Sequence, residues 1–159
     1  RAARPDVVLI SLIGTDSITF NRAFGEAGLA ATTLRLAGAV DETVLLGIGA
    51  DNTENLYSAS GYFSCIGSKA NDDFMSLNTA MFGVNAPPVG SVGQSNYEGL
   101  RFLKAAAERA GSLSLRPLAA AGRNIVGARG DVAIRQGRAA MAMHLAAADG
   151  LDFRIIRTF

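Results

Sequence analysis

A polar cluster that could hold a small ligand follows the first apolar run of the chain. Thr15, Asp16 and Ser17 come directly after the run Val7–Ile13 and Gly14. Between a strand and a helix, their hydroxyls, carboxylate and backbone N–H groups would converge at the sheet edge where ligands bind in open α/β folds. Ser17 or Asp16 would equally serve as the cap of the following helix. We therefore expect helix capping, ligand contact or both from this segment.

A second polar cluster follows the next extended run. Val40, Asp41 and Glu42 come after the expected strand Thr32–Ala37. Carboxylates at this place can accept charge-assisted hydrogen bonds from an amide or ammonium group, or can complement the dipole of the helix that they open. Tyr62 ends a third extended run, where its ring can form a wall of a small polar pocket or belong to the core. Both alternatives stay open for these residues.

No set of side chains in the sequence demands an enzymatic explanation. His144 lies among small residues, with no Ser, Cys or carboxylate at a spacing typical of a catalytic pair. Cys65 lies in neither a nucleophile elbow nor a redox motif, and one cysteine with one histidine cannot build a Cys/His zinc site. We expect no cofactor and no metal. A flavodoxin-like or hydrolase-type enzyme is supported only by the order of the elements.

Alternating extended and helical segments must position the two polar loops. The run Val7–Ile13 is typical of a parallel strand buried on both faces. Phe20, Phe24 and Ala27 then recur at helical spacing up to Gly28, which stands where a helix should end. The pattern predicts a strand, a loop and a helix, with further strands over 32–37 and 56–63.

The rest of the chain combines helices with short strands. Helical spacing predicts helices over 71–83, around 100–110 and over 113–121, followed by extended pieces at 125–126 and 132–134. Two last strands flank Asp149-Gly150, a favoured pair for a tight hairpin. The order predicts a mixed α/β fold around a largely parallel sheet that ends in a β-hairpin.

Composition excludes several classes of partner. Fifteen basic and fourteen acidic residues give a net charge of +1, and no basic run is present, so we expect no nucleic acid partner. The longest apolar stretch is far shorter than the roughly 20 residues that a membrane-spanning helix needs. The sequence begins at Arg1 without an initiator Met and leads within six residues into an expected strand. We therefore expect it to start inside a longer polypeptide.

Several segments together resemble the type I periplasmic binding proteins. They are Val8–Thr15, Ala39–Gly49 and Gly61–Ser64, joined by Tyr97–Gly99 and the closing stretch 130–156. The resemblance is nearest to the branched-chain amino acid, amide and urea binders, including amide-sensing regulators of bacterial amidase operons. It implies a Rossmann-like, three-layer lobe, one of two that clamp a ligand between them.

The resemblance also implies a division of the chain. Residues 1–66 and 124–159 would belong to the second, C-terminal lobe, and the helices of 67–123 would pack on a first lobe that is missing here. That N-terminal lobe or another chain should then cover the apolar stripes of these helices, since their exposure is costly.

A function follows from the resemblance as an expectation. The chain would belong to the periplasmic solute-binding component of an ABC transporter, with a small polar ligand such as an amino acid, an amide or urea, and with the transporter's membrane subunits as partners. The positions that match the family's ligand contacts are Thr15, Asp16, Ser17, Val40, Asp41, Glu42 and Tyr62. The alternative is a cytoplasmic amide-sensing transcription regulator of the same fold. Neither role is enzymatic.

Overall fold

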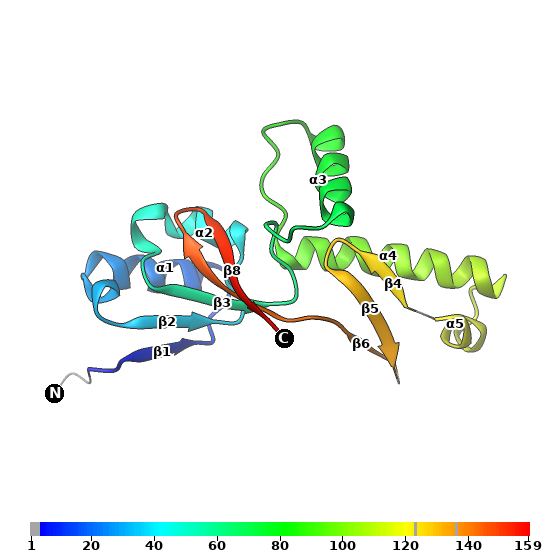
Figure 1. Ribbon diagram of the computed structural model, residues 1–159, viewed down its shortest axis with the longest axis horizontal. Helices are drawn as coiled ribbons and strands as arrows, with labels where there is room; N and C mark the ends of the chain where they lie inside the picture. The colour runs from blue at the N-terminus through cyan, green and yellow to red at the C-terminus, as the bar shows by residue number, and fades with distance from the viewer. Residues whose placement is uncertain (1–3, 123, 136) are drawn as a thin grey trace. The chain divides into compact units, whose positions relative to one another are not determined.

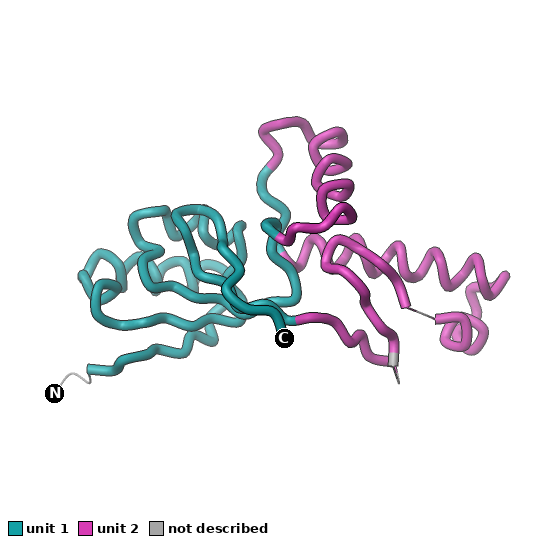
Figure 2. The backbone as a smooth tube through the Cα atoms, viewed as in Figure 1, with its two compact units in different colours: residues 1–65, 87–90, 143–159 teal, residues 66–86, 91–142 magenta. Residues whose placement is uncertain are grey.

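The chain folds into two compact units, each assembled from separate stretches of sequence. The computed structural model describes residues 4–122, 124–135 and 137–159. Unit 1 combines residues 1–65, 87–90 and 143–159, and unit 2 combines 66–86 and 91–142 (Figure 2). The chain therefore leaves unit 1 and returns to it twice.

Unit 1 is built on a five-stranded mixed sheet with the order β1-β2-β3-β7-β8 (Figure 1). Three strands run parallel, and two close the sheet as an antiparallel hairpin beside β3. The strands are β1 (Val7–Ile10), β2 (Leu34–Ala37), β3 (Leu56–Ser60), β7 (His144–Asp149) and β8 (Asp152–Thr158). Between them lie α1 (Gly14–Glu26), the 3-10 turn Leu29–Ala31, α2 (Glu42–Ile48) and the 3-10 turn Ala50–Asn52. The predicted α/β fold with a terminal hairpin is confirmed.

The core of unit 1 lies on one face of this sheet. Ile10, Ala37 and Leu56 point from the parallel strands toward Leu45 and Ile48 of α2, and all five are buried. Phe63 and Phe153 add an aromatic pair to the same cluster, with ring centroids 4.7 Å apart. Burial of this apolar surface supplies the main stabilisation of the unit, at about 25 cal/mol per Å2.

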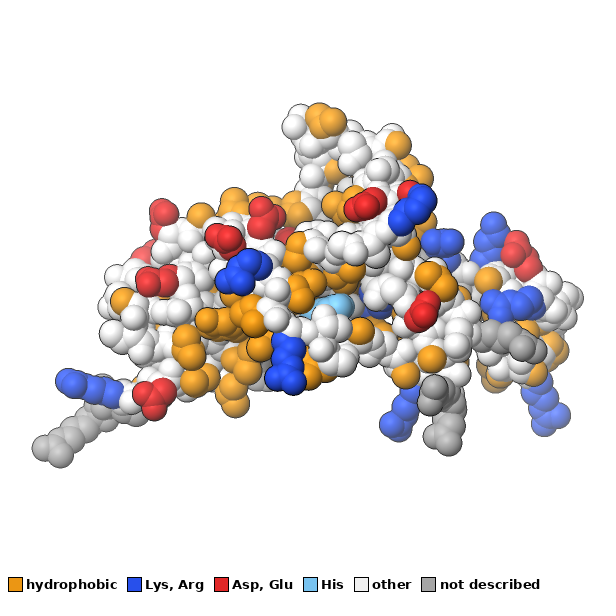
Figure 3. Space-filling model, in the orientation of Figure 1, with side chains coloured by type: hydrophobic (Ala, Val, Ile, Leu, Met, Phe, Trp, Pro, Cys, Tyr) orange, Lys and Arg blue, Asp and Glu red, His pale blue; other side chains and the backbone are white. Residues whose placement is uncertain are grey.

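The other face of the sheet is open along β1 and β2, where Figure 3 shows hydrophobic side chains over the strands of unit 1. Val7, Leu9 and Leu34 alternate with the core residues, and Leu9 is 76% exposed. The expectation that the first strand is buried on both faces is therefore wrong for the described residues. The sequence shows apolar side chains on both faces of the strand, but it does not show what covers them.

A buried arginine of β2 contacts α1. Arg35 is fully buried, and its guanidinium donates to Asn21 Oδ1 at 2.9 Å and to the carbonyls of Asn52 and Glu54 at 2.8 and 2.6 Å. Its Cζ atom lies over the ring of Phe24, 5.0 Å from the ring centroid. These contacts compensate for the cost of burying the charge, and they join β2, α1 and the loop before β3.

Unit 2 contains three helices and a small antiparallel sheet. They are α3 (Lys69–Phe82), α4 (Ser91–Ala110) and α5 (Leu115–Ala121), with the sheet β4 (Ile125–Gly127), β5 (Gly130–Arg135) and β6 (Arg138–Ala140). Apolar side chains of the predicted stripes remain exposed: Met81 by 67% and Leu100 by 69%. Phe74 packs against Tyr97, with ring centroids 4.9 Å apart. No helix in the described ranges is both long and apolar enough to span a bilayer.

The elements differ from their predicted bounds in instructive ways. The first strand ends at Ile10 instead of Ile13, and the hairpin turn is Gly150-Leu151, between the paired Asp149 and Asp152, one residue later than predicted. The segment 124–142 was expected with residues 1–66, but its strands lie in unit 2. The assignment of these units to the lobes of a larger protein stays a prediction.

Candidate functional site

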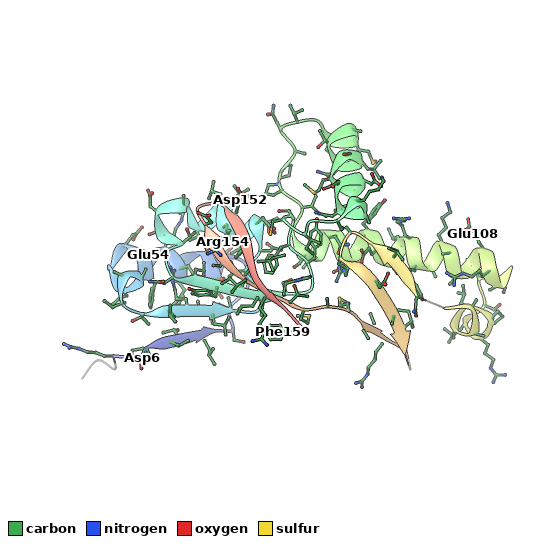
Figure 4. All side chains as sticks on the ribbon, in the orientation of Figure 1. Asp6, Glu54, Glu108, Asp152, Arg154 and Phe159 are labelled. Carbon is green, nitrogen blue, oxygen red and sulfur yellow. The ribbon has the colours of Figure 1, made fainter. Side chains whose placement is uncertain are left out.

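The candidate site is the edge of the unit 1 sheet at which the three parallel strands end. Because β1, β2 and β3 are parallel, the loops after them share this edge. The register places Ser60 opposite His144 and His144 opposite Thr158, so β7 begins and β8 ends there too. In Figure 4, Glu54 marks the opposite end of the sheet and Phe159 this one.

The loop after β1 is the exposed part of this edge. Every residue from Ser11 to Asp16 is exposed, and α1 begins at Gly14. Thr15 and Asp16 therefore lie in the first helical turn, whereas the sequence had suggested a loop. The N-cap is Ile13, whose side chain provides no hydrogen bond, so capping by Asp16 or Ser17 is wrong. The first-turn N–H groups have no side-chain acceptor at the N-cap position, which leaves donors for an outside acceptor.

Ser17 lies on the inner side of this helical turn. It is fully buried, and Asn21 Nδ2 donates to its carbonyl oxygen at 2.8 Å and to its hydroxyl at 3.5 Å. Of the three polar residues predicted here, only Thr15 and Asp16 present their side chains to solvent. Asp16 also complements the positive end of the α1 dipole.

Asp41 caps α2 and contacts a segment that returns from far along the sequence. Its Oδ1 accepts from the backbone N–H groups of Thr43 and Val44 at 3.2 and 3.3 Å, and from the Thr43 hydroxyl at 2.6 Å. The backbone of Gly90 packs directly on this carboxylate, since a Cβ there would lie 2.3 Å from Oδ2. The sequence predicted that a helix begins at Asp41-Glu42, but Gly90 carries no local signal of its long-range contact.

Glu42 is a buried carboxyl that binds the chain's own backbone. It is 1% exposed, and its Oε1 accepts from the Ser64 N–H at 2.6 Å and from the Ser64 hydroxyl at 2.8 Å. Burial raises the pKa of Glu42, while the hydrogen bonds from Ser64 act in the opposite direction. This carboxyl joins the start of α2 to the segment after β3.

Val40 and Tyr62 are both buried at this edge, at 1% and 0% exposure. The Val40 carbonyl accepts from the Ser58 hydroxyl at 2.6 Å, and the Tyr62 N–H donates to the Ser60 hydroxyl at 3.4 Å. Hydroxyls of β3 thus fix the positions of both neighbouring loops. Val40 belongs to the hydrophobic core.

His144 is brought to the same edge by strand pairing. It is 7% exposed, its Nδ1 lies 2.8 Å from the Thr158 hydroxyl, and its Nε2 has no hydrogen-bond partner among the described residues. Burial lowers the pKa of His144. Sequence spacing could not place it here, because its neighbours Ser60 and Thr158 come from β3 and from the end of the chain.

The arrangement suits recognition more than catalysis. The edge presents the Thr15 hydroxyl, the Asp16 carboxylate and the first-turn N–H groups of α1, while Asp41 and Glu42 are engaged by the protein itself. Such groups can bind a ligand that carries both hydrogen-bond donors and acceptors. Within the described ranges, no three His, Cys, Asp or Glu side chains are grouped so as to hold a metal ion.

Comparison with known proteins places the chain among binding proteins. The family model described as periplasmic binding protein matches residues 1–151. A search of curated proteins found no match.

Solved structures share the fold over almost the whole chain. An amino acid ABC transporter substrate-binding protein from Pseudomonas fluorescens Pf-5 is 18% identical, with a TM-score of 0.83 over 98% of this chain and 44% of its own. A solute-binding protein from Rhodopseudomonas palustris HaA2, in complex with p-hydroxybenzoic acid, is 23% identical, with a TM-score of 0.85 over 97% and 45%. A leucine-binding protein from Thermotoga maritima MSB8 is 21% identical, with a TM-score of 0.77 over 97% and 44%. The chain thus spans less than half the length of each of these structures.

Proposed function

The chain belongs to the periplasmic binding protein family, and we propose that it forms part of the solute-binding component of an ABC transporter. In this proposal, the edge of the unit 1 sheet where the parallel strands end supplies one wall of the ligand site. The family match confirms the resemblance to type I periplasmic binding proteins. This family consists of binding proteins and not of enzymes, as the sequence predicted.

One observation carries the proposal: the exposed polar turn at the start of α1. Thr15 and Asp16 lie beside N–H groups that lack a side-chain cap, at the sheet edge where ligands bind in α/β folds. The N–H groups and the Thr15 hydroxyl suit a carboxylate or a carbonyl oxygen. The Asp16 carboxylate suits an ammonium or amide N–H group. An amino acid or a short amide offers both kinds of group.

The buried residues of the edge then have a supporting role. Asp41, Glu42, Val40 and Tyr62 are sequestered in the protein's own hydrogen bonds or core. In this proposal they hold the loops in place, so that the exposed turn keeps a fixed geometry without reorganisation on binding. Preorganisation of this kind favours affinity because less conformational entropy is lost.

The test is a binding screen on the full-length protein that contains this chain. Leucine, a short-chain amide, urea, benzoate and p-hydroxybenzoate are added in turn while the unfolding temperature is recorded. A ligand at 100 times its Kd stabilises the native state by about 2.7 kcal/mol, which gives a clear rise in Tm. The absence of a shift with every compound, together with turnover of any of them, would refute the binding role.

Matched variants locate the site. Thr15→Val should weaken binding of the ligand that the screen identifies, whereas Thr19→Val, at an exposed position in the same helix, should not. Asp16→Asn should weaken an amino acid or amide and leave benzoate unaffected, with Glu26→Gln as the exposed control. Equal effects of the test and control variants would place the ligand elsewhere.

Localisation and partner follow from the same proposal. A solute-binding component of this family works in the periplasm and delivers its ligand to the transporter's membrane subunits, and hinge closure converts binding into a signal. The screen tests the amides and urea considered from the sequence together with amino acids and aromatic acids. One similar solved structure is an amino acid ABC transporter protein, and another is a complex with p-hydroxybenzoic acid.

A further inference from the structure

Unit 2 contains a pocket that is lined only by residues of this unit. It lies between α4 and the antiparallel sheet β4–β6 and has a volume of about 240 Å3. Apolar side chains form most of its wall: Phe102, Ile125, Val132, Ile134 and Met141. Its polar part consists of Ser95, Glu98 and Arg129.

Arg129 is the central group of this polar part. It is 8% exposed, and its Nε lies 2.7 Å from Glu98 Oε2, so the two charges compensate each other. Its Nη2 donates to Gln94 Oε1 and, at 2.6 Å, to the hydroxyl of Ser95. Two of the three guanidinium nitrogens therefore face oxygen atoms of α4.

The third nitrogen has a much weaker partner. Arg129 Nη1 donates to the thioether sulfur of Met141 at 2.9 Å, and both residues line the pocket. A thioether is a weak acceptor compared with a carbonyl or hydroxyl oxygen. An oxygen acceptor in place of this sulfur would stabilise a buried cationic donor more strongly, and Met141 is flexible enough to move aside.

We propose that this pocket binds a small, uncharged aromatic or aliphatic molecule whose carbonyl or hydroxyl oxygen accepts from Arg129 Nη1. The uncharged class follows from Glu98, which already neutralises the guanidinium, so a carboxylate would bring an uncompensated charge into an apolar wall. The size also fits, since an apolar cavity of about 150 Å3 in another protein admits benzene. This site is independent of the ligand site proposed on unit 1.

The experiment uses the full-length protein with 13C-labelled methionine methyl groups. The four methionines of this chain each contribute one signal to the spectrum of the full-length protein, and the Met141→Leu variant assigns the one that reports on the pocket. Benzamide is titrated as the probe, with benzoate as its charged counterpart. We expect a saturable shift of the Met141 signal with benzamide, none or a much weaker one with benzoate, and no shift of Met75 or Met81.

A pair of variants makes the assignment exact. Ala139→Phe places a ring in the pocket wall and should weaken benzamide binding by about tenfold or more, which corresponds to at least about 1.4 kcal/mol. Leu113→Phe, at an exposed apolar position of unit 2 outside the wall, should leave binding unchanged. If Ala139→Phe fails to fold, the Met141 signal of the wild type decides alone.

Three results would overturn the proposal. A Met141 signal that does not respond to benzamide at millimolar concentration would mean that another part of the protein fills the pocket. A response that survives in a folded Ala139→Phe variant would place the probe elsewhere. Stronger binding of benzoate than of benzamide would contradict the neutral class of ligand.

Discussion

Two buried ionisable side chains at the sheet edge of unit 1 have pKa values that are shifted so as to favour their uncharged forms. Burial raises the pKa of Glu42 and lowers that of His144, so folding favours the neutral form of each. Their effects on stability have opposite signs with respect to pH. Between the ordinary carboxyl pKa and the ordinary imidazole pKa, both contributions change with pH, in opposite directions. The pH dependence of the free energy of unfolding of the wild type therefore partly hides each of them.

Replacing Glu42 should reveal one of these effects. The native protein keeps a proton that the unfolded chain has already lost, so the free energy of unfolding falls as the pH rises from the ordinary carboxyl pKa through the raised value. Glu42→Gln should remove this decline and keep an oxygen acceptor for Ser64. Urea unfolding at a series of pH values measures it. Glu26→Gln, at an exposed position, should show the same dependence of unfolding free energy on pH as the wild type. If Glu42→Gln also showed the wild-type dependence, the decline could not be assigned to Glu42.

Replacing His144 should reveal the opposite effect. Below the ordinary imidazole pKa the unfolded chain binds a proton that the native state resists, so stability is fully present above that pKa and is lost as the pH falls through the lowered value. His144→Gln should flatten this loss at mildly acidic pH. The same urea series measures it, and a loss that persists in the variant would assign the acid sensitivity to another group.

At the scale of the elements, the start of α2 is the point where two distant segments meet. Asp41→Ala removes the acceptor for the Thr43 and Val44 N–H groups and should lower the free energy of unfolding by about 1 kcal/mol. Asp51→Ala, at an exposed site in a 3-10 turn, is the control and should cost less. Chemical denaturation compares the two. Equal decreases in the free energy of unfolding for the two variants would show that the Asp41 hydrogen bonds do not stabilise the protein.

Gly90 allows the same contact to be tested from the other side. A methyl group there would lie 2.3 Å from Asp41 Oδ2, so Gly90→Ala must displace the carboxylate or the returning segment. We expect a loss of stability of about 1 to 3 kcal/mol, as for other overpacked sites. Gly67→Ala should be nearly neutral, because a Cβ at 67 meets no atom within 4 Å. Thermal unfolding measures both variants. A Tm of Gly90→Ala no lower than that of Gly67→Ala would show that the contact between residue 90 and Asp41 can accommodate a methyl group.

Local patterns were enough to predict most elements, because helical spacing, cap residues and turn pairs depend on neighbouring residues. They identified the helix after Asp41 and the hairpin near Gly150. They could not show that Ser17 faces inward, that Gly90 packs on Asp41, or that His144 joins this edge, because those facts depend on long-range packing. The binding role of the predicted site residues stays a prediction, whereas the family is shown.

At the scale of the whole molecule, we expect the open face of the unit 1 sheet to promote self-association of the isolated chain. Val7, Leu9 and Leu34 are exposed together along an edge strand and its neighbour, and contiguous apolar surface of this kind drives association. Leu9→Lys should shift the 159-residue chain toward monomer in sedimentation velocity. Leu46→Lys, a half-exposed position on α2, should not. If Leu9→Lys left association unchanged, the exposed apolar side chains on the helices of unit 2 would be the surface to test next.

The pairing of β3 with β7 sets the order in which the polypeptide can acquire its structure during synthesis. β3 ends at Ser60, but its partner begins only at His144. While the ribosome makes the intervening segment, the outer edge of β3 has no β7 to pair with, and such edges attract other strands. Domains generally fold as units while the chain is made. Unit 1 can complete its sheet only after residues 143–158 have emerged, so this nascent chain should depend on chaperones for longer than one whose strands pair in sequence.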